Sequence, residues 1–329
     1  MAKTKRISEI DSLKGLLIIL VILGHTKEIH EHFRILYSWI YTFHMPIFFI
    51  LAGIFYKPGL GIKEYYKKIA YNYLRPYFIT AFICIIAGSI YNHFTHHHFI
   101  ESLTSLLFNS LYVTSYRWTL GPIWFLWSLF WALTTFHLIS SKIHSSPTKL
   151  FITLSLFTLS VASLVIYMPL SLQSGLSAVV YVYIGAWAKN YKDEIKNICS
   201  YLPFVCVIIF LWVYTTLRME VHISDTLYPH GLTSVFCTSV ISLFIISHAK
   251  LLECKFLTYI GKHTLLILCI HQILIHVGGY NPPLNIMTAN SFSLLIIECT
   301  YNTIITLALA FIFERIRSKW PLIHLENHK

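Results

Sequence analysis

Long apolar runs recur along almost the whole chain, and they constrain the fold more than any other feature. A helix of about 20 apolar residues is needed to cross the hydrocarbon core of a bilayer, which is about 30 Å thick. Ten runs of this kind cover residues 13–30, 36–56, 73–91, 120–140, 150–168, 174–189, 200–217, 231–248, 262–279 and 290–313. The sequence therefore predicts an all-α integral membrane protein with about ten transmembrane helices.

The composition excludes a water-soluble protein. Of the 329 residues, 56% are hydrophobic and 12% are charged, whereas a soluble domain carries about 25% charged residues. No internal repeat, low-complexity tract or linker rich in proline and glycine divides the chain, so we expect one membrane domain over residues 1–329. The shorter and more polar segment 99–114 is typical of a helix that lies in the membrane interface.

Lysine and arginine predict the orientation of the chain in the membrane. If the N-terminus is cytoplasmic, 21 of the 25 basic residues flank cytoplasmic ends of the runs. The other four are Lys27, Arg34, Arg117 and Arg218. This asymmetry follows the positive-inside rule and predicts that both termini are cytoplasmic. It also accounts for the net charge of +11 without a nucleic-acid partner, because no basic block is interleaved with aromatic residues.

Ionisable residues inside apolar runs are costly to bury in a bilayer and usually serve a function. Lys14 and His25 lie eleven residues apart in the first run, a spacing that puts them within about 20° on one helix face. Asp11, three residues before Lys14, joins the same stripe. We therefore expect a cationic group at the cytoplasmic edge of the membrane and an imidazole deep on the same helix face.

Other runs carry ionisable groups at a similar depth. His44 in the second run and Glu298 in the tenth lie about as deep as His25, and His271 is near the middle of the ninth. These groups predict one polar layer around a buried cavity.

Three motifs resemble a known family. R-I-x-E-I-D-S-L-K-G-x(9)-H-T at 6–26, F-H-M-P-I-F-F-I-L-A-G at 43–53 and L-R-P-Y at 74–77 resemble the acyltransferase-3 family of membrane O-acyltransferases. Pro122 with the following Trp124-Phe125-Leu126, and the late Gly261 and His271, fit the same pattern. The resemblance covers essentially the whole chain and is closest to the fucose 4-O-acetylase-like branch.

The resemblance implies an O-acetyltransferase of a bacterial cytoplasmic membrane. Such an enzyme moves an acetyl group from cytoplasmic acetyl-CoA to a hydroxyl of a surface polysaccharide or of a lipid-linked glycan precursor. A neutral imidazole can accept the hydroxyl proton or attack the thioester as a nucleophile, and His25 is the candidate for either role. Asp11 and His44 complete the predicted catalytic group.

The resemblance also suggests binding residues. The cations expected to attract the phosphates of CoA are Lys14, Arg75, Lys67 and Lys68. The residues expected to contact the acceptor sugar are Glu298, Trp124 and His271. The best-known family members have an arginine eleven residues before the histidine, where this chain has Lys14, and a lysine cannot make the same bidentate phosphate contact.

Some features keep other interpretations open. The run His93, His96, His97 and His98 has no cysteine beside it, so we interpret it as a solvated loop and expect no metal cofactor. Outer-loop Tyr116 and Trp118 are further candidates for stacking on a sugar. A transporter or flippase for a glycan or lipid would use the same polar layer. That alternative differs from the enzyme in one respect, since a flippase does not consume acetyl-CoA.

Overall fold

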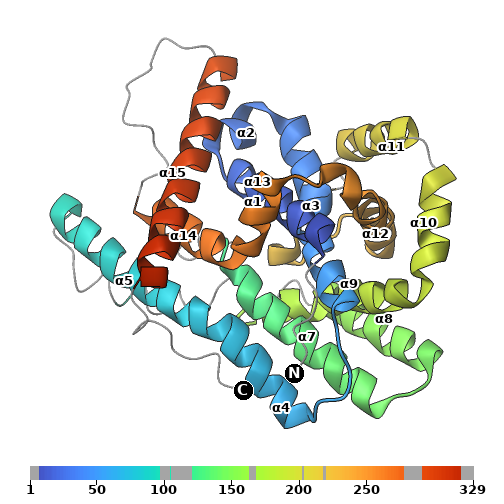
Figure 1. Cartoon of the computed structure of the whole chain (residues 1–329). Helices are drawn as coiled ribbons and strands as arrows, with labels where there is room; N and C mark the ends of the chain where they lie inside the picture. Colours follow the sequence, from blue (N-terminus) through green and yellow to red (C-terminus); the bar gives the residue numbers. More distant parts are fainter. Residues whose placement is uncertain are drawn as a thin grey trace.

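The computed structural model describes residues 7–96, 104, 121–162, 168–201, 204–217, 220–277 and 291–319. Within these residues the secondary structure is helical apart from one isolated bridge between His222 and Leu227, which confirms the predicted all-α class. The longer helices in Figure 1 are α1 (Ser8–Gly24), α3 (Arg34–Ile54), α5 (Arg75–His96), α7 (Trp124–Lys142), α8 (Ser146–Ala162), α9 (Leu172–Ala188), α10 (Lys192–Tyr201), α11 (Phe204–Thr216), α12 (Leu232–Ser247), α14 (Thr264–His276) and α15 (Ser291–Lys319). The short helical segments are α2 (Lys27–His32), α4 (Ile62–Ile69), η1 (Ala70–Leu74), η3 (Lys189–Tyr191), η4 (Ile223–Asp225), η5 (Ala249–Leu252) and α13 (Lys255–Lys262).

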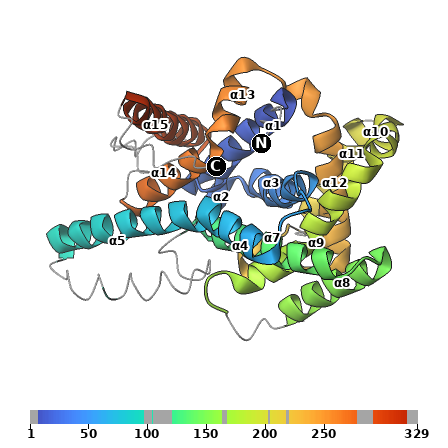
Figure 2. The ribbon, with the colours of Figure 1, turned by 60° about the horizontal axis from the view of Figure 1, so that its bottom comes forward.

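Helix α3 lies at the centre of the molecule, as Figures 1 and 2 show from two directions. It packs against α9, α12 and α1, and α9 in turn packs against α7 and α8. On the other side of α1, α14 packs against both α5 and α15. The centre of the bundle is therefore built from α1, α3, α7, α9 and α14, with the remaining helices around them.

A helix lies in each of the ten predicted ranges. Among the described residues, α3, the continuous helix Ile62–Ile90 and the Phe292–Ile316 part of α15 are long and apolar enough to cross a membrane. The bent pair α13 and α14 is a fourth candidate when it is taken as one span, and α8 and α12 are shorter apolar helices. These lengths are consistent with a multi-pass membrane protein. The predicted interfacial helix 99–114 lies outside the described residues, except for residue 104.

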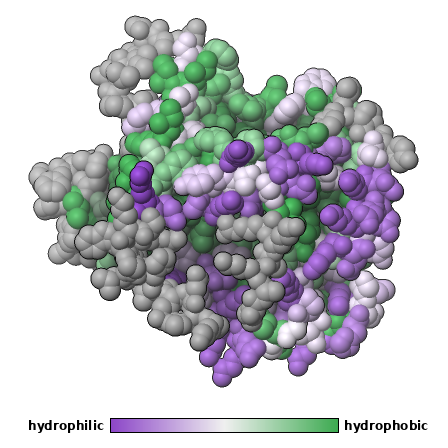
Figure 3. All heavy atoms as spheres, in the orientation of Figure 1, coloured by the Kyte–Doolittle hydropathy of each residue, from purple (hydrophilic) through white to green (hydrophobic). Residues whose placement is uncertain are grey.

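Large apolar side chains point outward from the peripheral helices. On α15 they include Phe292, Ile304 and Ile312, with exposed fractions of 62%, 61% and 55%. On α5, Phe82 is 67% exposed. Figure 3 shows hydrophobic residues gathered over the upper part of one face, where α15 lies, and hydrophilic residues along its right and lower parts. Outward apolar surface of this extent marks a lipid or protein interface rather than a water-exposed surface.

A break in the helix lies inside one predicted range, 13–30, and at the edge of another, 262–279. The first range contains the end of α1 at Gly24 and the start of α2 at Lys27. The second begins at a 73° bend between α13 and α14. Thr26 has an extended backbone, with φ −76° and ψ 131°, so the helical hydrogen-bond pattern does not continue through it. Hydropathy reports the burial of a segment but not its backbone angles.

Glycines allow two helix pairs to approach at backbone distance. A Cβ atom at Gly15 of α1 would collide with the carbonyl oxygen of Leu257, and one at Gly261 of α13 would collide with the carbonyl oxygen of Asp11. Gly53 and Gly185 form the same kind of contact between α3 and α9. Small residues at such crossings are typical of helix packing in membranes.

We predict that Gly261→Ala destabilises the protein, because the added methyl group cannot be placed unless α1 and α13 separate. Overpacking of this kind typically costs about 1–3 kcal/mol. Thermal unfolding in detergent, followed by size-exclusion chromatography, measures the effect. Gly61→Ala is the matched control, because a Cβ at Gly61 meets no atom within 4 Å. Equal melting temperatures for the two variants would contradict the prediction.

Candidate functional site

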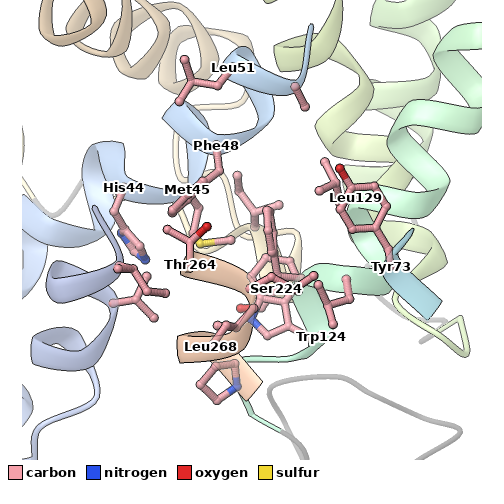
Figure 4. Close-up of a pocket in the computed structure, with 18 of the residues that line it drawn as sticks. His44, Met45, Phe48, Leu51, Tyr73, Trp124, Leu129, Ser224, Thr264 and Leu268 are labelled. Atoms are coloured by element: carbon pink, nitrogen blue, oxygen red, sulfur yellow. The ribbon is translucent and has the colours of Figure 1, made fainter. Parts of the chain in front are cut away.

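A cavity of about 1290 Å³ lies between α1, α3, α7 and α14 and is bordered by the connection between α11 and α12. One stripe of α3 lines it from end to end: Tyr37, Tyr41, His44, Met45, Phe48, Leu51, Ala52 and Phe55. Because a helix rises about 1.5 Å per residue, this stripe is about 27 Å long, close to the thickness of a bilayer core. Figure 4 shows His44 and Phe48 of α3 facing Trp124 and Leu129 of α7 across the cavity.

Helix α1 lines the cavity with Lys14, Ile18, Val21 and His25. This agrees with the prediction that Lys14 and His25 share one face of the helix. Helices α1 and α3 run in opposite directions. Leu13 near the start of α1 packs in one cluster with Leu51 near the end of α3, while Gly24 at the end of α1 lies beside Tyr41. Lys14 and His25 are therefore separated along the length of the cavity by about 16 Å.

The backbone around His25 determines which nitrogen of its ring is basic. His25 is the C-cap residue of α1, and its Nδ1–H donates to the carbonyl oxygen of Val21 at 2.8 Å. A neutral imidazole with a proton on Nδ1 keeps its lone pair on Nε2. The ring of His271 lies edge-on to that of His25, with 5.2 Å between the centroids. His271 itself is fully buried, and the described residues that line the cavity do not include it.

Helix α15 contacts the break between α1 and α2. The carboxylate of Glu298 accepts a hydrogen bond from the backbone N–H of Glu28 at 3.2 Å, and the amide of Asn302 donates to Oγ1 of Thr26 at 3.5 Å. Glu298 was predicted to contact the acceptor sugar, but it is absent from the described lining of the cavity. Its observed role is to supply a partner for a backbone group that the interrupted helix leaves free.

His44 presents a second imidazole to the cavity. It lies in α3, is 3% exposed, and donates from Nδ1 to the carbonyl oxygen of Ile40 at 2.5 Å. This hydrogen bond fixes the same tautomer as in His25. The ring of Tyr41 lies edge-on at 4.9 Å. His25 and His44 therefore enter one cavity from two helices, as the depth estimate predicted.

The cavity has a cationic end, which we call the lysine end, lined by Lys14, Lys57 and Lys68. The ammonium group of Lys14 pairs with the carboxylate of Asp11 at 2.6 Å. Asp11 is buried and is absent from the described lining, so its contact with the cavity passes through Lys14.

The remaining predicted cations do not line the cavity among the described residues. Lys67 is exposed, because successive residues on a helix point about 100° apart and it is Lys68 that faces the cavity. Arg75 stacks its guanidinium over the ring of Tyr71 at 5.2 Å and donates to its hydroxyl at 2.5 Å.

Aromatic residues line the middle of the cavity opposite α3. Trp124, at the start of α7, and Tyr73 of η1 both line it. The contact of Trp124 with the acceptor sugar stays a prediction. Tyr116 and Trp118 lie outside the described residues.

The other end of the cavity, which we call the loop end, was not predicted. It is lined by Tyr37 and Tyr41 of α3 and by residues 221–225 of the connection between α11 and α12. Burial raises the pKa of Asp225 to about 6, opposed in part by a hydrogen bond from Ser224. Burial lowers the pKa of His222, which Glu220 partly offsets. In the sequence, residues 221–225 look like an ordinary loop between two apolar runs. The i, i+4 spacing of Tyr37, Tyr41 and Met45 indicates that these three residues share one helix face, but not that this face meets the loop.

No group of three or more histidine, cysteine, aspartate or glutamate side chains suited to a metal ion is found in the part of the chain that the structure describes. His97 and His98 of the predicted solvated run lie outside that part.

Comparison with known proteins assigns the family. The acyltransferase-3 family model, described as an acyltransferase domain, matches residues 7–315. No curated protein and no solved structure matches the chain. The matched region contains α1, the cavity and nearly all of α15, which agrees with the resemblance drawn from the motifs around Lys14, His25 and His44. The chain therefore belongs to the acyltransferase-3 family of membrane acyltransferases.

Proposed function

We propose that this acyltransferase moves an acetyl group from cytoplasmic acetyl-CoA to a hydroxyl of a cell-surface polysaccharide or of a lipid-linked glycan precursor. One observation carries the proposal: a single cavity connects the lysine end to the loop end, and His25 and His44 line it between the two. An anionic donor needs cationic side chains at its binding site, whereas a polyhydroxyl acceptor needs hydrogen-bond partners and aromatic rings. A cavity with two chemically different ends can hold both against one imidazole.

The proposed topology has ten spans with both termini in the cytoplasm of a bacterial cell. It rests on the positive-inside distribution of lysine and arginine and on the helix found in each of the ten predicted ranges. In this orientation the lysine end opens to the cytoplasm, where acetyl-CoA is made. The loop end then opens to the outer side, where the acceptor glycan is presented.

On the donor side, Lys14, Lys57 and Lys68 attract the phosphates of CoA. Lys14 keeps ammonium hydrogens available beyond the one it shares with Asp11, because a lysine has three donors. Asp11 holds Lys14 in place through the 2.6 Å ion pair. Arg75 and Lys67 contribute to the positive potential of this face without lining the cavity.

The chemical step uses Nε2 of His25 as a general base. The acceptor oxygen attacks the thioester carbonyl carbon while its proton passes to Nε2. The C–S bond then breaks, and the imidazolium returns the proton to the CoA sulfur, so that an O-acetyl ester and free CoA result. In an alternative route Nε2 attacks the thioester first and an acetyl-histidine transfers the group. The continuous cavity favours direct transfer, because donor and acceptor reach the same imidazole.

A glycan or lipid flippase is the competing function, since a cavity about as long as the bilayer is thick also suits a transport pathway. The family assignment favours the enzyme. Within the family, the fucose 4-O-acetylase-like branch remains our proposal for the acceptor class. Transfer of radiolabel from acetyl-CoA to glycan in membranes that contain the protein separates enzyme from flippase, because a flippase leaves acetyl-CoA intact.

We predict that His25→Ala abolishes acetyl transfer while the protein still inserts into the membrane. Loss of a general base typically costs about 10²–10⁴-fold in rate. Transfer of label from radiolabelled acetyl-CoA to the host's surface glycans measures the effect. His248→Ala is the matched control. His248 caps α12 with nearly the same backbone angles and donates from Nδ1 to Phe244 at 2.9 Å, but it is outside the described cavity lining. Retained transfer in His25→Ala would exclude the proposed role.

Substitution of Lys14 tests the donor end. Lys14→Ala removes a cation from the cavity, so we expect the KM for acetyl-CoA to rise by roughly tenfold, in line with the loss of a hydrogen bond to a charged group. Lys14→Arg retains the charge and adds a bidentate contact, so its KM should equal or fall below that of the wild type. Steady-state kinetics with varied acetyl-CoA give both values. An unchanged KM in Lys14→Ala would remove Lys14 from the donor site.

A pair of substitutions at Glu298 separates positioning from acceptor binding. Glu298→Leu leaves the backbone N–H of Glu28 without its partner, so we expect kcat to fall by roughly tenfold with little change in KM for the acceptor. Glu298→Gln retains an oxygen that accepts this hydrogen bond and should keep most of the activity. If both variants instead raised the KM for the acceptor, Glu298 would contact the sugar, as the sequence analysis predicted.

A further inference from the structure

A short, internally hydrogen-bonded loop borders the loop end of the cavity. The N–H of His222 donates to the carbonyl of Leu227 at 3.1 Å, the N–H of Leu227 donates back at 3.0 Å, and the N–H of Asp225 also donates to the carbonyl of His222, at 3.1 Å. Thr226 takes a left-handed conformation with φ 53° to complete the turn. The 221–228 loop is therefore a defined structure, and its residues Val221 to Asp225 line the cavity.

A charge pair joins this loop to α3. The guanidinium of Arg34 pairs with the carboxylate of Glu220, and Glu220 is 3% exposed. The same guanidinium lies over the ring of Tyr37 at 5.2 Å. The Glu220 side chain is buried and that of Arg34 is half exposed, and the pair joins the start of the loop to the helix that carries the two tyrosines.

The surface that the loop and α3 form together is aromatic. The rings of Tyr37 and Tyr41 stack with 4.1 Å between centroids, and His222 lies 5.0 Å from Tyr41. Tyr41 is only partly buried and lines the cavity. Its ring also touches His44, at 4.9 Å. A ligand that stacks on Tyr41 therefore lies next to the imidazoles of the proposed reaction site.

We propose that this surface is the acceptor subsite, and that it binds one uncharged pyranose ring by stacking on Tyr41 and His222 and by hydrogen bonds from its hydroxyls to Asp225. This inference rests on the proposed acyl transfer, of which it specifies the acceptor. The face of an aromatic ring carries negative charge and attracts the weakly positive C–H groups on one face of a sugar. A carboxylate accepts hydrogen bonds from hydroxyl groups but donates none when it is ionised.

The charges at this end select against an acidic sugar. Asp225 lines the cavity together with Glu31 and Lys27. Glu31 and Lys27 pair with each other at 4.0 Å, so the net negative charge of these three residues is that of Asp225. Arg34, which would otherwise bind a carboxylate, is already paired with Glu220. A uronic acid would bring its carboxylate toward that of Asp225, and like charges in contact across an interface are costly. The same repulsion disfavours a phosphate group at this end.

The test measures sugar binding in the absence of acetyl-CoA. The purified full chain in detergent is titrated with the methyl glycosides of glucose, galactose, mannose and fucose, with methyl glucuronide, and with sorbitol, and binding is followed by saturation-transfer NMR. We expect at least one neutral glycoside to bind at least about tenfold more tightly than the glucuronide. Sorbitol has the hydroxyls but no ring face, so it should not bind.

Variants then assign the binding to the subsite. Tyr41→Ala should weaken binding of the neutral glycoside by roughly tenfold, while Tyr41→Phe keeps the ring and the affinity. Asp225→Asn should reduce the difference in affinity between the neutral glycosides and the acidic glucuronide. Tyr191→Ala is the matched control, since the ring of Tyr191 also lies against an aromatic ring, that of Trp187 at 4.9 Å, but Tyr191 is outside the described lining of the cavity.

Three results would overturn the proposal: no neutral glycoside binds, sorbitol binds as tightly as the glycosides, or the Tyr41→Ala and Tyr191→Ala variants bind the neutral glycoside with equal affinity. Because the assay contains no acetyl donor, its result is independent of the acetyl-transfer measurement. Sugar binding without acetyl transfer would contradict the enzyme function but leave the subsite in place. Acetyl transfer without sugar binding at Tyr41 would contradict the subsite alone.

Discussion

Where a helix is interrupted in an apolar environment, the backbone N–H and C=O groups at the break need other hydrogen-bond partners. This requirement governs the structure around His25. Helix α1 ends at Gly24 and α2 begins at Lys27, which frees backbone groups that water would otherwise satisfy. The neighbouring helix α15 supplies the partner for the N–H of Glu28 through Glu298, and Asn302 reaches Thr26. His25 lies at the interruption, and its own Nδ1–H satisfies the Val21 carbonyl. The hydrogen bond to Val21 sets the tautomer of the imidazole, and the contacts from α15 hold the break at which His25 lies.

The cavity follows from how closely the central helices approach one another. Backbone contacts at Gly15 and Gly261 hold α1 against α13, and those at Gly53 hold α3 against α9. Helices α1 and α3 thus pack against α13 and α9 at their glycines, while another stripe of each helix lines the cavity. Lys14, Lys57 and Lys68 line one end of this space, and Asp225 and the aromatic loop end lie at the other. This difference between the two ends supports the proposal that an anionic donor binds at one end and a neutral polyhydroxyl acceptor at the other.

Residue spacing predicted the features that depend on one helix. The eleven-residue separation of Lys14 and His25 placed both on one face, and both line the cavity. His44 was predicted to lie at the depth of His25, and it enters the same space from α3. Local spacing did not predict which neighbouring cation faces inward: Lys68 lines the cavity and Lys67 does not. The sequence places Glu298 deep in the last apolar run. Its contact with Glu28 joins residues 270 positions apart, and no local pattern reveals such a contact.

The sequence by itself determined the class of the protein, the location of its helices and the helix faces that carry Lys14, His25 and His44. Apolar composition and helical periodicity are local properties, and the free energy of burial in a bilayer depends on them directly. Only the tertiary structure decided where the first helix breaks, which groups hold that break, and that the loop after α11 folds back onto Tyr37 and Tyr41. These features arise from contacts such as that between Arg34 and Glu220, 186 positions apart, and they exist only when the packed helices bring distant segments together.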